Sequence, residues 1–262
     1  MDPGTLVGVG LALAAIFISM IMEGGNPASI LLPPALLLVF LGTFGVAMAG
    51  GLLKDFTGAL ASLKTAMLSS KAEDDDTIAT IVSFADKARR EGLLALEEAA
   101  RGIEDPFFKK GIELAVDGTD PDELREILEA EIQSKKQADK RNAQVFADMG
   151  AYAPTIGIIG TVLGLIHVLE NLSNPEELGH LIAGAFCATL WGVLTANVFW
   201  LPIGKKLNRI GAAEAHHMEL ILEGVISIQA GANPRVVEQK LLSFLPPAER
   251  AAAEAAAEEK AA

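Results

Sequence analysis

Two threonines, Thr161 and Thr189, each lie in a long apolar stretch, on a helical face that is otherwise lined by small residues. A threonine hydroxyl can ligate a hard cation such as sodium, because these ions prefer oxygen ligands. The same hydroxyl can instead bond to a carbonyl of its own helix, which is a packing role without a ligand. The spacing therefore predicts a cation path past these two residues or, alternatively, a pair of structural threonines.

No carboxylate lies near these hydroxyls in the sequence. Four stretches lack Asp, Glu, Lys and Arg altogether: 5–22, 28–53, 152–169 and 181–204. A bare charge in hydrocarbon is costly and must be neutralised or coordinated. His167, near the end of the third stretch, is expected to be a satisfied structural histidine. An ion-moving role would therefore need a carboxylate from a second protein.

Pro154 and Pro202 lie in the third and fourth apolar stretches, each near one end. Proline has no amide hydrogen, so it loosens the hydrogen-bond ladder of a helix that contains it. These two residues are interpreted either as simple kinks or as hinges of functional importance.

The four apolar stretches are each long enough to cross a bilayer as a helix. Of the 21 Lys and Arg residues, 14 lie in 54–141 and the other 7 lie from Lys205 onward. The two short connectors between the apolar stretches, 23–27 and 170–180, contain no Lys or Arg. Because cytoplasmic segments are enriched in Lys and Arg, we expect both termini to be cytoplasmic and both connectors to face outward. A cleaved signal peptide is the rival interpretation of the first stretch, but that stretch lacks a basic leader and a small-residue cleavage site.

The expected fold is an all-α integral membrane protein with four transmembrane helices and a helical cytoplasmic domain between the second and third. Residues 1–53 would hold transmembrane helices 1 and 2 with a short outer loop, and 54–149 the cytoplasmic domain. Residues 150–204 would hold transmembrane helices 3 and 4 with an outer loop. Residues 205–262 would form cytoplasmic helices and an Ala/Glu-rich tail.

Local signals divide the cytoplasmic domain. The second membrane helix is expected to run on past Lys54 toward Lys71, and Gly92 should interrupt a later amphipathic helix. A short helix over 93–101 should expose Glu97 and Glu98, and bury three leucines, Leu93, Leu94 and Leu96.

A strong start signal comes after this short helix. Asp120 as N-cap, Pro121 at the first helical position and Glu123 three residues after the cap together predict a helix start. No stop signal follows before Gly150, so this helix is expected to continue into the third membrane helix.

Composition excludes several functions. The formal net charge of −13 argues against nucleic acid as a partner, and a single cysteine, Cys187, excludes an internal disulfide or a Cys-rich metal motif. No Ser-His-Asp set and no Gly-rich phosphate loop occurs in a credible setting, so neither an enzyme nor a bound cofactor is expected.

Several motifs resemble those of a known family, the flagellar motor stator subunits MotA/PomA, which are related to TolQ/ExbB. They are FADKARREGLLALEE (84–98), GIELAVDG (111–118), APTIGIIGTVLGL (153–165) and GANPR (231–235). The resemblance implies a multi-pass protein of the bacterial inner membrane, in which a homopentamer of this subunit surrounds a pair of MotB/PomB-type subunits. The single membrane helix of that partner would supply the ion-binding aspartate, and Na⁺ or H⁺ would be transported.

The resemblance also implies roles for particular residues. Torque would pass to the rotor protein FliG through exposed charges of the cytoplasmic domain, and the two prolines would couple ion binding to movement. The charges map to Arg90 and Glu98, with their neighbours Arg89 and Glu97, and the prolines to Pro154 and Pro202. Thr161 and Thr189 match positions typical of sodium-driven members, which favours Na⁺ over H⁺.

Two other functions remain open. A TolQ/ExbB-like energiser of outer-membrane processes shares the inner helices, but such proteins usually have three crossings and lack the charged motif. A non-conducting membrane anchor that recruits cytoplasmic partners would have no single-span partner with an intramembrane aspartate.

Overall fold

The computed structural model describes residues 4–68 and 74–251, and these residues form helices joined by short turns, with no strand among them. The α-helices are α1 (Gly4–Met22), α2 (Pro33–Ala49), α3 (Leu53–Leu68), α4 (Asp74–Glu91), α5 (Leu96–Ala100), α6 (Pro106–Val116), α7 (Pro121–Glu170), α8 (Pro175–Thr195), α9 (Leu201–Gln229) and α10 (Pro234–Leu242). The chain also has two 3₁₀ turns, η1 (Pro27–Ile30) and η2 (Leu93–Ala95), one π-helical turn, η3 (Ala196–Trp200), and a short helical segment over 247–251. The expected all-helical class is confirmed.

The described residues fold as two units. The first unit comprises 4–68 and 138–210, and the second comprises 74–137 and 211–251. Helices α7 and α9 each contribute residues to both units.

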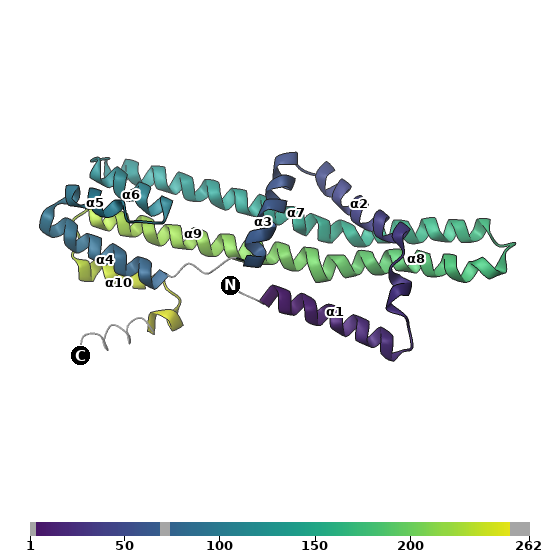
Figure 1. Ribbon diagram of the computed structural model, residues 1–262. Helices are drawn as coiled ribbons and strands as arrows, with labels where there is room; N and C mark the ends of the chain where they lie inside the picture. The colour runs from purple at the N-terminus through teal and green to yellow at the C-terminus, as the bar shows by residue number, and fades with distance from the viewer. Residues whose placement is uncertain (1–3, 69–73, 252–262) are drawn as a thin grey trace. The chain divides into compact units, whose positions relative to one another are not determined.

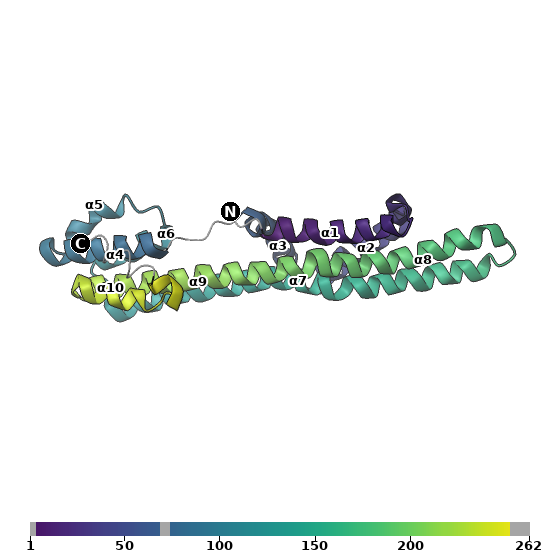
Figure 2. The ribbon, with the colours of Figure 1, turned by 90° about the horizontal axis from the view of Figure 1, so that it is seen from below.

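In the first unit, α8 runs antiparallel beside the second half of α7 (Figure 1). Helix α2 packs against α8, and α1 contacts η1 and η3. Helix α3 crosses the axis of α7 in Figure 1 and does not run parallel to it. In Figure 2, where the protein is seen from below, α3 is foreshortened because it is viewed nearly along its own axis.

Three helical runs are long and apolar enough to cross a membrane: Gly4–Met22, Pro121–Glu170 and Pro175–Gln229. Helix α2 is shorter, at 17 residues, which is the lower limit for a crossing. None of the residues of α1 is buried within this chain. Such an unburied apolar helix needs lipid or another polypeptide around it.

Helix α2 does not run on past Lys54 as the sequence predicted. It begins at Pro33, with Pro33 and Pro34 in its first turn, but the chain breaks at Gly50 and Gly51 before α3. Two consecutive glycines are poor helix formers because they lose the most backbone entropy. The expectation that the helix runs on past Lys54 was therefore wrong.

The second unit has a continuous apolar core. Helices α4, α5, α6 and α10, the beginning of α7 and the end of α9 all contribute to it. Its largest fully buried side chains include Ile81, Leu96, Ile112, Leu128 and Ile221. The buried Phe108 packs against the partly buried Phe84, with ring centroids 5.7 Å apart.

Several boundaries follow the local signals. Helix α7 begins at Pro121 after Asp120, whose side chain accepts a bond from Asp122 N–H, and it continues without a break for 50 residues. Gly92 ends α4 with a φ of +85°, a region that favours glycine. One burial prediction was wrong: Leu96 is buried, but Leu94 is 74% exposed because the 3₁₀ turn η2 points it away from the core.

The passage from α8 to α9 contains a feature that the sequence did not predict. In η3 the Leu201 N–H bonds the Ala196 carbonyl, five residues back, and Pro202 follows immediately. Proline cannot donate to the carbonyl four residues earlier, so the regular ladder is interrupted here. Trp200, at the end of this turn, packs edge-on against Phe44 with ring centroids 5.7 Å apart, which ties the irregular turn to α2.

Candidate functional site

Glycines bring α7 and α8 into backbone contact. A Cβ added to Gly157 would lie 2.7 Å from the Ala188 carbonyl oxygen, and one added to Gly192 would lie 2.6 Å from that of Ala153. Gly164 approaches Ala185 in the same way, with 2.6 Å between the added Cβ and the Ala185 Cβ. The small-residue faces of the third and fourth apolar stretches therefore meet each other within one chain.

The two threonine hydroxyls meet in this contact. Thr161 Oγ1 and Thr189 Oγ1 are hydrogen-bonded to each other across the two helices. Thr161 Oγ1 also lies 3.0 Å from the Ala185 carbonyl oxygen, and both hydroxyls lie 3.3 Å from the Gly157 carbonyl oxygen. Two hydroxyls and two carbonyls thus form a cluster of four neutral oxygens.

The four oxygens are of the kind that a hard cation prefers, but they also form hydrogen bonds with one another without any ion. The bond from Thr161 to Gly157, four residues earlier in its own helix, is the packing role that the sequence left open. The bonds to Ala185 and Thr189 cross to the other helix and go beyond that role. Neutral oxygens can share the coordination of a cation, but they do not neutralise its charge.

The two prolines lie at different levels of the helix pair. Pro154 follows Ala153, whose carbonyl faces Gly192, whereas Pro202 follows Leu201, whose side chain packs on Gly150. Helix α7 continues through Pro154 without a break, but the chain at Pro202 adjoins the π-helical turn. The hydrogen-bond ladder is therefore disturbed more at Pro202.

His167 lies at the far end of α7. Its side chain is exposed, and its Nδ1 lies 3.8 Å from Glu170 Oε2. Among the residues that the structure describes, no three His, Cys, Asp or Glu side chains gather into a metal-binding group. The role of His167 as a structural residue stays a prediction.

The four charges with an expected rotor role lie in the second unit, on α4 and α5. Arg89, Arg90, Glu97 and Glu98 are all exposed. Arg90 Nη2 pairs with Asp86 Oδ2 at 2.9 Å within its own helix. The buried side chain of Leu96 fixes α5 on the core, so these charges lie on well-anchored elements.

Sequence reasoning missed two buried threonines of the first unit, Thr195 and Thr43, and the partly buried Trp191. Thr195 donates to the Trp191 carbonyl at 2.7 Å, and Trp191 Nε1 donates to the Ile30 carbonyl at 2.7 Å, which ties α8 to the turn before α2. Thr43 is only 1% exposed, and its hydroxyl has no hydrogen-bond partner among the described residues. Only the assembled fold identifies such residues, because isolated threonines in apolar helices have no distinguishing spacing.

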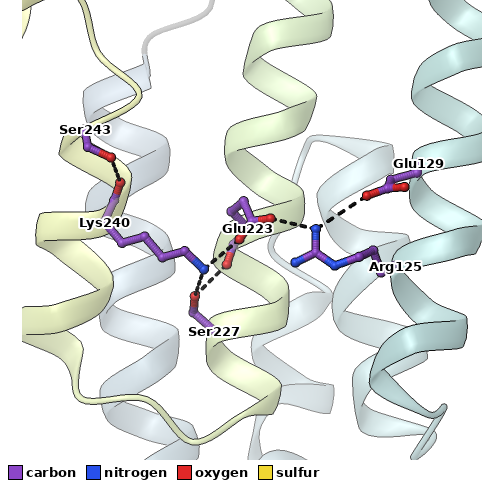
Figure 3. Close-up of polar contacts among 6 residues, drawn as sticks. All are labelled: Arg125, Glu129, Glu223, Ser227, Lys240 and Ser243. Atoms are coloured by element: carbon purple, nitrogen blue, oxygen red, sulfur yellow. Dashed lines mark hydrogen bonds and ion pairs between the residues drawn. The ribbon is translucent and has the colours of Figure 1, made fainter.

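An ion-pair network that the sequence did not predict joins α7, α9 and α10 in the second unit (Figure 3). Glu223 accepts bonds from Arg125 Nη1 at 2.7 Å and from Lys240 Nζ at 2.6 Å. Burial raises the pKa of Glu223, but the hydrogen bonds from Arg125 and Lys240 outweigh that effect and hold its pKa below the ordinary value of 4.5. The carboxylate of Glu223 therefore stays charged and links the three helices.

Neutralising Glu223 should destabilise the second unit. Because its pKa is lower in the folded state than in the unfolded chain, its contribution is present above the unfolded pKa and is lost as the pH falls through the folded pKa. We expect Glu223→Gln to lower the free energy of unfolding by about 2 kcal/mol at neutral pH. Thermal unfolding of the full chain, measured at neutral and at acidic pH, checks this.

The matched control is Glu129→Gln. Glu129 lies 3.4 Å from the same Arg125 on an exposed surface, so we expect a loss below about 0.5 kcal/mol. Equal losses for the two variants, or a loss for Glu223→Gln that persists unchanged in acid, would contradict the role given to Glu223.

Comparison with known proteins supplies the family. A model of the MotA/TolQ/ExbB proton channel family matches residues 99–220. Motility protein A of Bacillus subtilis is 36% identical over 95% of this chain and 93% of its own length. Chemotaxis protein PomA of Vibrio alginolyticus is 35% identical over 96% of this chain and 98% of its own length.

Two solved structures share the fold. The structure of C. jejuni MotAB matches with a TM-score of 0.90 and that of the flagellar MotAB stator complex from Bacillus subtilis with 0.87. Both chains are 35% identical to this one, and each match covers 94% of this chain and 97% of the other. These relatives are channel and stator components and not enzymes, which confirms the prediction of a non-enzymatic protein.

Proposed function

We propose, because this chain belongs to the MotA/PomA family of flagellar stator subunits, that it is the housing subunit of a stator that couples cation flow across the inner membrane to torque on the rotor. A MotB/PomB-type subunit with one membrane helix is its partner. The solved MotAB complexes of relatives support that pairing. The partner supplies the acidic group that binds the cation.

The observation that carries this proposal is the oxygen cluster of Thr161 and Thr189, combined with the lack of carboxylates around it. The hydroxyls and the carbonyls of Gly157 and Ala185 offer a cation only neutral ligands. In the apolar parts of α7 and α8, residues 152–169 and 181–195, the sequence contains no Asp or Glu. A cation that passes here needs an acidic residue from outside the chain to balance its charge.

The proposed topology has four crossings, made by α1, α2, the second half of α7, and α8 with the start of α9. Both termini lie in the cytoplasm, since the Lys and Arg residues all fall in the segments that this topology places there. Large apolar side chains of α7, such as Ile158, Val162 and Leu165, are exposed in the single chain. These exposed side chains support an assembly in which lipid and neighbouring copies cover them, and the homopentamer is the assembly that we propose from the family resemblance.

Sodium is the favoured ion, and the cytoplasmic charges are the proposed contact with FliG. Two hydroxyls and two carbonyls can ligate Na⁺ beside the acidic group of the partner, whereas a proton carried by that acidic group would need none of these oxygens. Arg90 and Glu98, with Arg89 and Glu97, present both signs of charge on exposed positions of α4 and α5. Opposite charges on the rotor would complement them.

Reconstitution tests the proposal directly. Liposomes that contain this chain with its co-expressed partner should carry a sodium current, and liposomes with this chain alone should hold both Na⁺ and H⁺ gradients. In the complex, Thr161→Val should raise the half-saturating sodium concentration about tenfold, because one oxygen ligand is replaced by a methyl group of the same size. Flux measured against sodium concentration gives this value.

Thr161→Ser is the matched control, because it keeps the oxygen and removes only a methyl group. It should stay within about twofold of the parent. A sustained selective current from the chain alone would overturn the housing role, and a flux independent of sodium in the parent complex would replace Na⁺ by H⁺ as the ion.

A further inference from the structure

Helix α3 lies across the helices that span the membrane. It crosses the axis of α7 in Figure 1 and is foreshortened in Figure 2, so its own axis is close to the plane of the bilayer. Phe56 and Ala59 on its inner face are buried with Phe146 and Met149 of α7 and with Leu207 of α9. Helix α3 therefore lies beside the point on α7 where the apolar part ends and the charged residues begin.

Two further contacts hold α3 at this level. A Cβ added to Gly58 would lie 2.8 Å from Asn142 Oδ1, so α3 and α7 approach closely there. Asp55 Oδ1 lies 3.6 Å from Arg141 Nε. Helix α3 is thus a fixed part of the first unit, and its outward face is a permanent feature of the surface.

That outward face combines leucines with lysines. Leu53 is 63% exposed and Leu60 is 46% exposed, and they share the face with Thr57 and with the exposed Lys54 and Lys64. Leucines fully exposed to water at this density would be unfavourable. An apolar face bordered by lysines is typical of a helix that lies in the headgroup region of a membrane, with leucines toward the acyl chains and lysine ammonium groups toward the phosphates.

The charges around α3 are mostly positive. The described residues at this level of the first unit include seven cationic and three anionic side chains: Lys54, Lys64, Lys140, Arg141, Lys205, Lys206 and Arg209, against Asp55, Asp139 and Asp148. This local excess of four positive charges contrasts with the net charge of −13 for the whole chain. Juxtamembrane cations of this kind attract anionic headgroups.

We propose that the outward face of α3 is a binding surface for the anionic phospholipid headgroups of the adjacent leaflet, with Lys54 and Lys64 as the headgroup ligands. Leu53 and Leu60 insert among the upper acyl chains and hold α3 parallel to the membrane. The inference depends on α7 and α8 crossing the bilayer, but not on which ion is transported or on the rotor contact. It can therefore fail while the proposed function stands.

Collision accessibility of a spin label tests the position of α3. In the full chain with Cys187 replaced by alanine, a label at Leu60→Cys in lipid nanodiscs should collide several times more often with oxygen than with a water-soluble nickel chelate. A label at Glu113→Cys, on the exposed surface of α6 in the second unit, should show the reverse. A Leu60 label open to the nickel chelate means that the face is in water, and one shielded from both reagents means that another protein chain covers it. Either result overturns the proposal.

Lipid selectivity tests the headgroup chemistry. Co-purified or exchanged lipid should be enriched in phosphatidylglycerol over phosphatidylcholine about tenfold in the parent, and this enrichment should fall severalfold in Lys54→Gln/Lys64→Gln and at high salt. The matched control is Arg101→Gln/Arg235→Gln, which removes two exposed charges from the second unit and should keep the enrichment. No enrichment in the parent, or equal enrichment in the two double variants, would overturn the assignment of Lys54 and Lys64.

Discussion

Exchanging two charges, by Arg90→Glu together with Glu98→Lys, is expected to stop rotation while the protein still folds and inserts. Arg90 is 74% exposed and pairs with Asp86 of the same helix, an exposed pair worth at most about 1 kcal/mol. Glu98 is exposed on α5, which is anchored by the buried Leu96. Folding therefore loses little, whereas the pattern of charge offered to a rotor protein is reversed.

The expected size of this effect follows from charge repulsion at an interface. Like charges placed opposite each other cost several kcal/mol, so torque and swimming speed should fall at least about tenfold. Tracking of swimming cells measures the loss of speed, and membrane fractionation shows whether the variant inserts normally. Reversing the matching charges on the rotor should restore movement.

The control for this experiment changes two other exposed charges of the second unit, by Arg235→Glu together with Glu113→Lys. It should leave swimming within about twofold of the parent. The neighbouring pair, Arg89→Glu with Glu97→Lys, settles the register of the contact. Normal swimming of both charge-exchanged pairs would refute the assignment of α4 and α5 as the rotor surface.

Enlarging Gly192 should have the largest effect on assembly. A Cβ at this position would lie 2.6 Å from the Ala153 carbonyl oxygen and 3.1 Å from Gly157 Cα, and backbone atoms cannot rotate away as a side chain can. Gly192→Val must therefore push α7 and α8 apart and separate the Thr161 and Thr189 hydroxyls. We expect a loss of at least about 3 kcal/mol and no functional stator, measured by thermal unfolding in detergent and by motility.

Gly45→Val is the matched control, because a Cβ at Gly45 meets nothing within 4 Å in this chain. Its thermal midpoint should stay within a few degrees of the parent. If Gly192→Val unfolds at the parent temperature and supports swimming, the backbone contact between α7 and α8 does not hold the pair together.

The sequence predicted those parts of the fold that short local signals determine. Asp120 and Pro121 marked the start of α7, Gly92 marked the end of α4, and the absence of a stop before Gly150 anticipated the long continuous helix. These boundary predictions succeeded because a capping residue or a glycine affects the conformation of its immediate neighbours. The break at Gly50 and Gly51 was missed, because the hydrophobicity of the surrounding stretch outweighed the poor helix propensity of two glycines.

The remaining features depend on contacts between distant segments. The sequence placed Thr161 and Thr189 on small-residue faces, but only the crossing of α7 and α8 brings their hydroxyls together. Nothing local pairs Glu223 with Arg125, which lies 98 positions away. Pro202 marks a place where the helical hydrogen-bond ladder is weakened, but a proline alone does not distinguish a kink from the π-helical turn that precedes it, in which Trp200 packs against Phe44 of α2. The roles of the prolines, the threonines and the rotor charges stay predictions.

The backbone contact between α7 and α8 also limits how this protein can change during evolution. With glycine on both sides of the crossing, neither helix can accept a bulkier residue without losing the other. Under the role proposed for Thr161 and Thr189, a lineage that adapts to a different ion must use side chains no larger than threonine at these positions, such as valine or alanine. Each of these exchanges removes one hydroxyl oxygen and adds no bulk at the crossing.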